Sequence, residues 1–452
     1  MLKTLRLLWS AGDIRRKLLI TLGILVLYRL VAQVPVPGAD REAVAAAFGG
    51  GSAGGTLLQT INIISGGTLR NFSVLAMGVY PYITAQIILQ LLIPIVPSFK
   101  ARMEDDQREG RKWMERWTYY LAIPMATLQA FAQINLFALA SQGGAEIIPG
   151  FGFGADAEIL RSVTVLFVMT AGTMFAIWLG ELISEFGIRN QGLSLIIFAG
   201  IITQIPLNIG QLLSSAVEDL AFIVIFLLVL TLLMIFVIVF VQQGRRNVPV
   251  MYPGRRMGNR MSMPVKGTLP LMVNMAGMIP LIFASAILQF PAIIAGLFSG
   301  SNIEWLANMA VTVTNLFNPN GSTYGVIYFF MVVLFAFFYT TVLFEQQNYG
   351  EKLKRVGAQI PGVSRGAPTQ RYLGKVLRRI TLPGALFLGI VAVMPYLVPV
   401  LVPSLRLASS STGTLLVSSS GLLIVVGVIR DTFFNIDAEL KLHGYDESML
   451  VR

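Results

Sequence analysis

Ten long apolar runs divide this 452-residue chain, and they constrain its fold more than any other feature. Each run is long enough to cross about 30 Å of hydrocarbon as a helix. Only helices and closed barrels satisfy their backbone groups in a bilayer, and continuous apolar runs favour helices. The expected spans are 18–36, 72–93, 117–140, 159–182, 192–209, 220–241, 269–297, 324–344, 380–402 and 412–429. We therefore expect an all-α polytopic membrane protein with ten transmembrane helices.

The distribution of cations predicts how these helices are oriented. Of the 34 Lys and Arg residues, 29 fall in the two tails and in every second loop. Loops rich in Lys and Arg remain in the cytoplasm. Both termini and the basic loops 94–117, 243–268 and 345–379 are therefore expected there. The net charge of +11 then reflects orientation in the bilayer rather than nucleic-acid binding, apart from contact with a ribosome.

The chemical groups that most enzymes need are missing from the spans. The chain has no Cys, its single His443 lies in the C-terminal tail, and no Asp falls inside a span. It also lacks a glycine-rich phosphate loop ending in Gly-Lys-Ser/Thr. We therefore expect no catalysis, no metal site and no cofactor, and energy from a nucleotide must come from another protein.

Ionisable groups are almost absent from the apolar runs. Glu181, Glu185 and Glu345 lie at span edges, and Arg29 alone lies well inside a run. Arg29 either extends to the outer interface or pairs with backbone carbonyls beside a pore. Ion-coupled carriers usually bind their ions with charged groups near mid-membrane. A secondary transporter with inverted five-helix repeats remains one interpretation of the chain.

The two halves and one short segment complete the organisation. The loop 210–219 separates five spans from five, giving an N-terminal half at 1–217 and a C-terminal half at 218–452. Because five is odd, the second half starts on the opposite side, so the halves can form an inverted pair. The segment 56–69 is apolar but too short to cross. It is either half-inserted inside the protein or an interfacial loop at the outer surface.

Two aliphatic pairs have the spacing that places both members on one helix face. They are Val79 with Ile83 and Leu193 with Ile197, each at i, i+4. Such faces usually contact lipid or neighbouring helices. If they met around an axis, they would form a narrow apolar collar that excludes water and ions without any charge. Spacing alone leaves both interpretations open.

Five stretches of the chain carry the pattern of one known family, at residues 61–92, 178–201, 269–291, 360–373 and 421–431. They resemble the SecY family of protein-conducting channels, and the resemblance extends from Arg15 to about Lys441. It implies an hourglass pore between two inverted five-helix halves in the cytoplasmic membrane. Such a pore opens across the membrane for secreted chains and sideways for hydrophobic segments.

The resemblance also assigns roles to individual residues. It places the pore constriction at Val79, Ile83, Leu193, Ile197, Ile282 and Ile424. A short plug helix closes the outer funnel in segment 56–69, with Thr56, Leu57, Ile61, Ile64, Gly66 and Gly67. The lateral gate lies between the second and third spans on one side and the seventh and eighth on the other, with neutral polar Thr84, Gln129 and Asn274 near it.

The partners implied are those of a translocase. They are small membrane subunits resembling SecE and SecG, the motor ATPase SecA, the ribosome, and an unfolded preprotein with its signal sequence. Loops 243–268 and 345–379 resemble the projections that receive motor and ribosome, with candidate residues Arg255, Arg256, Arg260, Arg365 and Arg371. These cations also serve topology and attract anionic lipid. Ser364 stands where the family places its prominent Arg, so the one-residue shift to Arg365 is expected to weaken or re-aim the motor contact.

Overall fold

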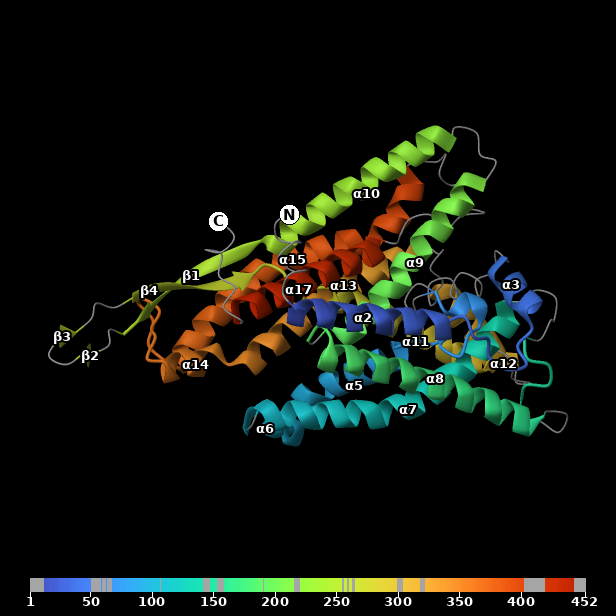
Figure 1. Cartoon of the computed structure of the whole chain (residues 1–452), viewed down its shortest axis with the longest axis horizontal. Coiled ribbons are helices and arrows are strands. Elements are labelled where there is room, and N and C mark those ends of the chain that lie inside the picture. The colour runs from blue at the N-terminus through green and yellow to red at the C-terminus, as the bar shows by residue number, and fades with distance from the viewer. Residues whose placement is uncertain are drawn as a thin grey trace.

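The computed structural model of the chain describes most of its length. The described residues are 12–49, 58, 62, 67–105, 107–140, 147–152, 158–189, 191–214, 220–253, 256–257, 260–261, 265–298, 304–317, 322–401 and 419–442. Over this part the protein is an elongated, mostly helical bundle (Figure 1). Small strands extend from one end of it.

The elements form two sets of helices, separated along the chain by α10 and four strands. The first set is α2 (Gly12–Val31), α3 (Arg41–Gly49), η1 (Leu69–Asn71), α5 (Tyr80–Ile95), α6 (Pro97–Asp105), α7 (Gln107–Ala140), α8 (Ile159–Phe186) and α9 (Gly192–Ser214). After α10 (Leu220–Gln243) come β1 (Arg245–Tyr252), β2 (Arg256–Met257), β3 (Arg260–Met261) and β4 (Val265–Met272). The second set is α11 (Ile279–Phe298), α12 (Glu304–Leu316), α13 (Ser322–Gln347), α14 (Tyr349–Arg355), α15 (Ala367–Leu401) and α17 (Ser419–Leu442).

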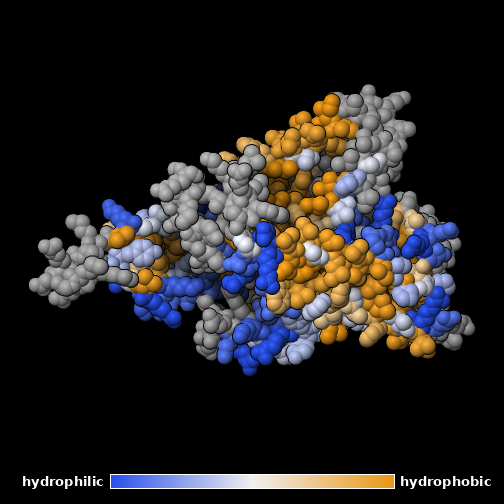
Figure 2. Space-filling model, in the orientation of Figure 1, coloured by the Kyte–Doolittle hydropathy of each residue, from blue (hydrophilic) through white to orange (hydrophobic). Residues whose placement is uncertain are grey.

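Several helices have the length and composition of membrane spans. Within the described residues these are Ile159–Phe186, Val224–Gln243, Thr323–Arg355 and Ala367–Met394, with shorter apolar helices at Tyr80–Ile93, Gly192–Pro206 and Ile279–Pro291. Figure 2 shows a broad hydrophobic region across the middle of the visible face and hydrophilic residues toward both ends. This distribution is that of a membrane protein. The full set of ten spans stays a prediction.

Two expected spans become helical later than the sequence predicts, in segments whose residues are described. The second span was expected from residue 72, but α5 begins at Tyr80 because residues 72–79 form a bridge and turns, with Gly78 at φ +51°. The seventh was expected from residue 269, but α11 begins at Ile279 because residues through Met272 pair as β4 with β1. The fold is therefore mostly helical rather than wholly helical.

The main core of the bundle is apolar, and its buried polar groups are neutral. Helix α13 packs on α15, α5 packs on α7, and α11 packs on both α7 and α13. Among the described residues, the buried polar side chains are Thr21, Asn62, Thr68, Ser73, Thr84, Gln90, Thr118, Gln129, Gln133, Ser162, Thr173, Gln242, Asn274, Ser285, Gln289, Thr340, Thr369 and Thr381. That part of the interior thus has the uncharged character that the sequence indicates.

A second, smaller core lies at the strand-bearing end. Strands β1 and β4 pair antiparallel from Arg245 opposite Met272 to Tyr252 opposite Val265. Met251 also exchanges two backbone hydrogen bonds, of 2.8 and 2.9 Å, with Gln359. The buried residues of this core are Val248, Val250, Leu271, Phe344, Leu353, Ala358, Ile360, Leu373 and Leu377. The segments after α10 and after α13 thus form one body, the hairpin unit, comprising β1, β4, α14 and the start of α15.

Candidate functional site

The six residues assigned to the constriction come from four helix regions and are mostly buried. Val79 is the N-cap of α5, where it is 2% exposed, and Ile83 follows one turn later. Leu193 and Ile197 lie on α9, Ile282 on α11 and Ile424 on α17. Five of the six belong to the main core and Leu193 packs against it. The six side chains therefore belong to, or pack against, one large apolar core.

The start of α9 is fixed closely against α8. A Cβ built on Gly192 would collide with the backbone oxygen of Gly180, and a Cβ on Gly180 would stand 2.8 Å from Leu193 Cδ2. Only glycines allow this approach of the two helices. The position of Leu193 thus depends on the packing of α8 and of the turn before α9.

Two of the three residues predicted near the gate meet, and the third does not join them. Gln129 on α7 donates from Nε2 to Thr84 Oγ1 on α5 at 3.0 Å, and both side chains are buried. Asn274 donates instead to the carbonyl oxygen of Gly277, within the turn before α11, at 3.0 Å. Within the described part of the chain, these side-chain hydrogen bonds therefore do not cross from α5 and α7 to the turn before α11.

A bond that the sequence did not indicate crosses from α5 to α11. Tyr80 donates from its hydroxyl to the carbonyl oxygen of Ala286 at 3.3 Å. Elsewhere on α5, α7 and α11, individual buried amide atoms lack a hydrogen-bond partner among the described residues: Oε1 of Gln90, Gln129 and Gln133, and both polar atoms of Gln289. The sequence does not show that a backbone oxygen will accept this bond. It does show the Gln residues within the apolar spans.

Most of the described part of segment 56–69 is buried. Leu58 and Leu69 are fully buried, and Asn62 accepts hydrogen bonds from Gly67 N–H at its backbone oxygen (2.7 Å) and from Arg70 N–H at Oδ1 (3.0 Å). Gly67 has φ +78°, and a Cβ there would collide with the Gln204 amide of α9. Thr56, Leu57, Ile61, Ile64 and Gly66 lie outside the described residues.

The candidate docking residues lie on and beside the hairpin unit. Arg365 and Arg371 are exposed, at the turn before α15 and in its first turns. Thr369 donates to the carbonyl oxygen of Ser364 at 2.7 Å, which fixes that turn. Arg256 and Arg260 belong to the short β2–β3 pair, and Arg255 is outside the described residues.

Protein-family comparison identifies the chain's relatives. The family model described as SecY matches residues 73–433. A protein translocase subunit SecY from Mycobacterium bovis is 39% identical over 444 residues, covering 96% of each chain. One from Streptomyces scabiei is 35% identical over 453 residues, covering 97% of each.

Solved structures share the fold at lower sequence identity. One is of a SecY protein whose plug domain stabilises the closed state of the translocation channel and maintains a membrane seal. It matches with a TM-score of 0.64 at 18% identity, covering 94% of this chain and 92% of that one. Another is Sec61 in a canine ribosome–channel complex from the endoplasmic reticulum, with a TM-score of 0.61 at 17% identity and the same coverage. The overall helical arrangement is thus that of protein-conducting channels.

Proposed function

The chain belongs to the SecY family, and we propose that it is the central pore-forming subunit of a preprotein translocase. In this role it conducts unfolded secretory polypeptides across the cytoplasmic membrane and releases transmembrane segments sideways into lipid. The observation that carries the proposal is 39% identity over 96% of the chain to a protein translocase subunit. The uncharged, apolar interior of the described part agrees with it.

The pore forms between an N-terminal half, 1–217, and a C-terminal half, 218–452, each with five helices in inverted topology. Contacts of α11 from the second half with α5 and α7 from the first support this arrangement. The transporter alternative has less support. Carriers of charged solutes or ions place ionisable groups near mid-membrane, whereas the buried polar side chains of the described part are neutral.

The collar consists of Val79, Ile83, Leu193, Ile197, Ile282 and Ile424. Aliphatic side chains around a narrow opening expel water, so ions meet a barrier although no charge repels them. A polypeptide of any sequence can displace these side chains, because they make no directional bonds that each substrate would have to replace. Sealing and tolerance of many substrates then have the same physical cause.

The gate opens along the junction of α5 and α7 with α11 and α13, near Thr84, Gln129 and Asn274. The bond from Tyr80 to Ala286 and the unpartnered amide of Gln289, three residues later on α11, support a closed state of limited stability. A buried amide without partners costs free energy, about 1–3 kcal/mol. An apolar signal helix can therefore compete for this seam.

The plug occupies segment 56–69 and closes the outer funnel until a substrate enters. The complete burial of Leu58 and Leu69 supports a segment inserted in the protein over an interfacial loop. The candidate residues Thr56, Leu57, Ile61, Ile64, Gly66 and Gly67 belong to this segment. The plug is a property of the SecY structure with which this chain shares its fold.

The chain works with partners and supplies no catalysis itself. Arg255, Arg256, Arg260, Arg365 and Arg371 form the surface that receives the motor ATPase SecA or the ribosome, and small subunits resembling SecE and SecG complete the membrane complex. The match to a ribosome-bound channel supports ribosome docking in general. Anionic lipid headgroups compete for the same cations.

Reconstitution tests the proposal. The chain is placed in liposomes with its small membrane subunits, the motor ATPase, ATP and an unfolded secretory precursor. Protection of the precursor from external protease, dependent on ATP, is the expected result. Gradient-driven uptake of a small solute, with no protected precursor, would show a carrier instead.

A further inference from the structure

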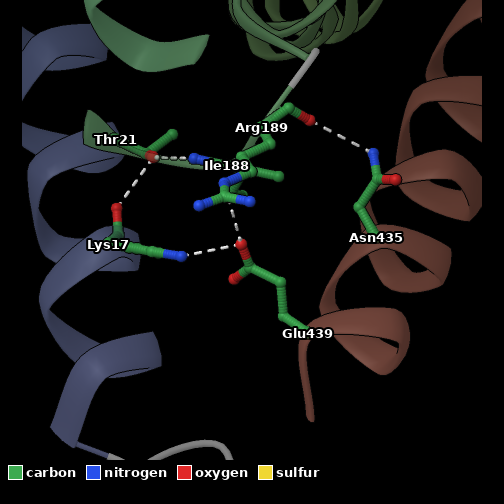
Figure 3. Close-up of polar contacts among 6 residues, drawn as sticks. All are labelled: Lys17, Thr21, Ile188, Arg189, Asn435 and Glu439. Atoms are coloured by element: carbon green, nitrogen blue, oxygen red, sulfur yellow. Dashed lines mark hydrogen bonds and ion pairs between the residues drawn. The ribbon is translucent and has the colours of Figure 1, made fainter. Parts of the chain in front are cut away.

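One carboxylate joins three parts of the chain that are distant in sequence. Glu439 lies near the end of α17, and its Oε1 is 2.7 Å from Nζ of Lys17 in α2 and 3.7 Å from Nε of Arg189 in the turn before α9. Figure 3 shows both cationic side chains directed at this carboxylate. The cations come from the first half of the chain and the anion from the second.

Neutral hydrogen bonds extend the same contact. Thr21 donates to the carbonyl oxygen of Lys17 at 2.8 Å and accepts from Ile188 N–H at 3.3 Å. Asn435, one helical turn before Glu439, donates to the carbonyl oxygen of Arg189 at 3.3 Å. The turn before α9 is thus bonded to α2 on one side and to α17 on the other (Figure 3). We call Lys17, Thr21, Arg189, Asn435 and Glu439 the clasp.

Burial makes the clasp more than a surface ion pair. The Glu439 side chain is 15% exposed and that of Lys17 is 25% exposed, whereas Arg189 is 70% exposed. Exposed ion pairs contribute little, but a mostly buried carboxylate that loses its cation keeps the cost of desolvation. Lys17 is therefore the main partner and Arg189 the auxiliary one.

The clasp holds the ends of two helices that carry collar residues. The turn at Arg189 leads directly into α9 with Leu193 and Ile197, and α17 carries Ile424 about four helical turns before Glu439. Helices α9 and α17 also pack on one another. A bond at their ends therefore restricts the tilt of one against the other, and that tilt sets how tightly the collar closes.

We propose that Glu439, held by Lys17 and Arg189, is a positioning residue that aligns α9 with α17 and thereby keeps the resting collar closed to ions. The inference rests on the channel function proposed above. From the sequence, Lys17 and Arg189 indicated only the orientation of the chain in the membrane. The inference gives them a second role.

Resting conductance of the reconstituted complex tests this role. Glu439→Gln keeps the size of the side chain and removes its charge, and Lys17→Glu places two like charges together. Both variants should raise ion leak, roughly two- to tenfold, with Lys17→Glu the stronger. The double variant Lys17→Glu with Glu439→Lys restores the pair in reverse and should return the leak toward the wild-type value.

Glu158→Gln is the matched control, because the ion pair that Glu158 forms within the described residues is local, with Arg161 at 3.7 Å (i, i+3). It should not change the leak. Precursor translocation and thermal unfolding are measured on every complex, since a collar effect raises leak without an equal loss of folded protein. The inference is overturned if Lys17→Glu complexes that still translocate leak no more than wild type. It is also overturned if the double variant leaks as much as the single variants. Failure of the wild type to translocate would instead reject the channel function.

Discussion

The hairpin unit and the seam between α5, α7 and α11 are stabilised in opposite ways. In the hairpin unit, β1 and β4 pair along eight residues each, and Val250, Leu271 and Leu373 fill a separate core. At the seam, Tyr80 to Ala286 is a cross-helix bond and both polar atoms of Gln289 lack partners in the described part. A rigid body suits docking of large partners. A seam with few directional bonds suits opening.

A covalent link across the seam would break this contrast most completely. Thr84→Cys and Asn274→Cys introduce the only thiols, since the chain has no Cys. Treatment with a reducible bifunctional thiol reagent should abolish translocation, because the helices can no longer part. Protease protection of a precursor measures the effect.

Each single Cys variant with the same reagent is the control, and reduction should restore activity. Full activity in complexes shown to be cross-linked would remove these two positions from the gate.

A polar residue in the collar should open the seal without affecting docking. Ile282 is 8% exposed, and Ile282→Asn offers water an amide where it met only aliphatic groups. Resting ion conductance is expected to rise about tenfold, the change that roughly 1.4 kcal/mol off the permeation barrier produces. Ile282→Leu keeps the apolar character and should behave as wild type. Equal conductance in all three proteins would refute the collar assignment at this position.

A cavity in the hairpin unit should have the reverse effect. Leu373 is fully buried there, and truncation of such a leucine to alanine costs about 2–5 kcal/mol. Leu373→Ala should therefore reduce motor-driven translocation severalfold and leave ion leak unchanged. Motor affinity and conductance are measured on the same complex. A rise in leak would mean that the two regions are not independent.

The smallest effect is expected when a methyl group is added at Gly67, within the proposed plug segment. Gly67→Ala costs about 1–2 kcal/mol for its left-handed backbone, and its Cβ also collides with Gln204. A moderate increase in resting leak should follow as the segment shifts.

Gly362→Ala is the matched control. Gly362 has the same φ of +78° but nothing within 4 Å of its Cβ position. It lies beside the hairpin unit, so backbone strain alone should not cause leak. Leak in Gly362→Ala as large as in Gly67→Ala would contradict a local plug effect.

The sequence predicted what depends on local composition. The runs 159–182, 220–241 and 324–344 correspond to α8, α10 and α13 because an unbroken apolar run leaves few alternatives to a helix. Residues 269–272 read as the start of a helix, yet they pair with β1. Their conformation depends on a partner strand that begins more than 20 residues earlier.

The contacts that join distant segments were beyond sequence reasoning. Lys17 and Glu439 are 422 positions apart, and each reads alone as a solvated charge. The bond from Tyr80 ends on a backbone oxygen, which every residue offers. By contrast, Thr84 and Gln129 were recognised as neutral polar residues in apolar helices, and they do meet. The sequence therefore indicated the chemical type of these side chains, whereas their contact partners depend on the fold.

Cross-linking of a stalled precursor tests the central claim most directly. A photoreactive residue is placed at Ile83, Ile197, Ile282 or Ile424, and at Phe236 of α10, which is 69% exposed on an apolar face. The account predicts that a precursor halted during translocation cross-links at the four collar positions and not at Phe236. A halted precursor that cross-links at none of the four would contradict the apolar collar as the path of the polypeptide.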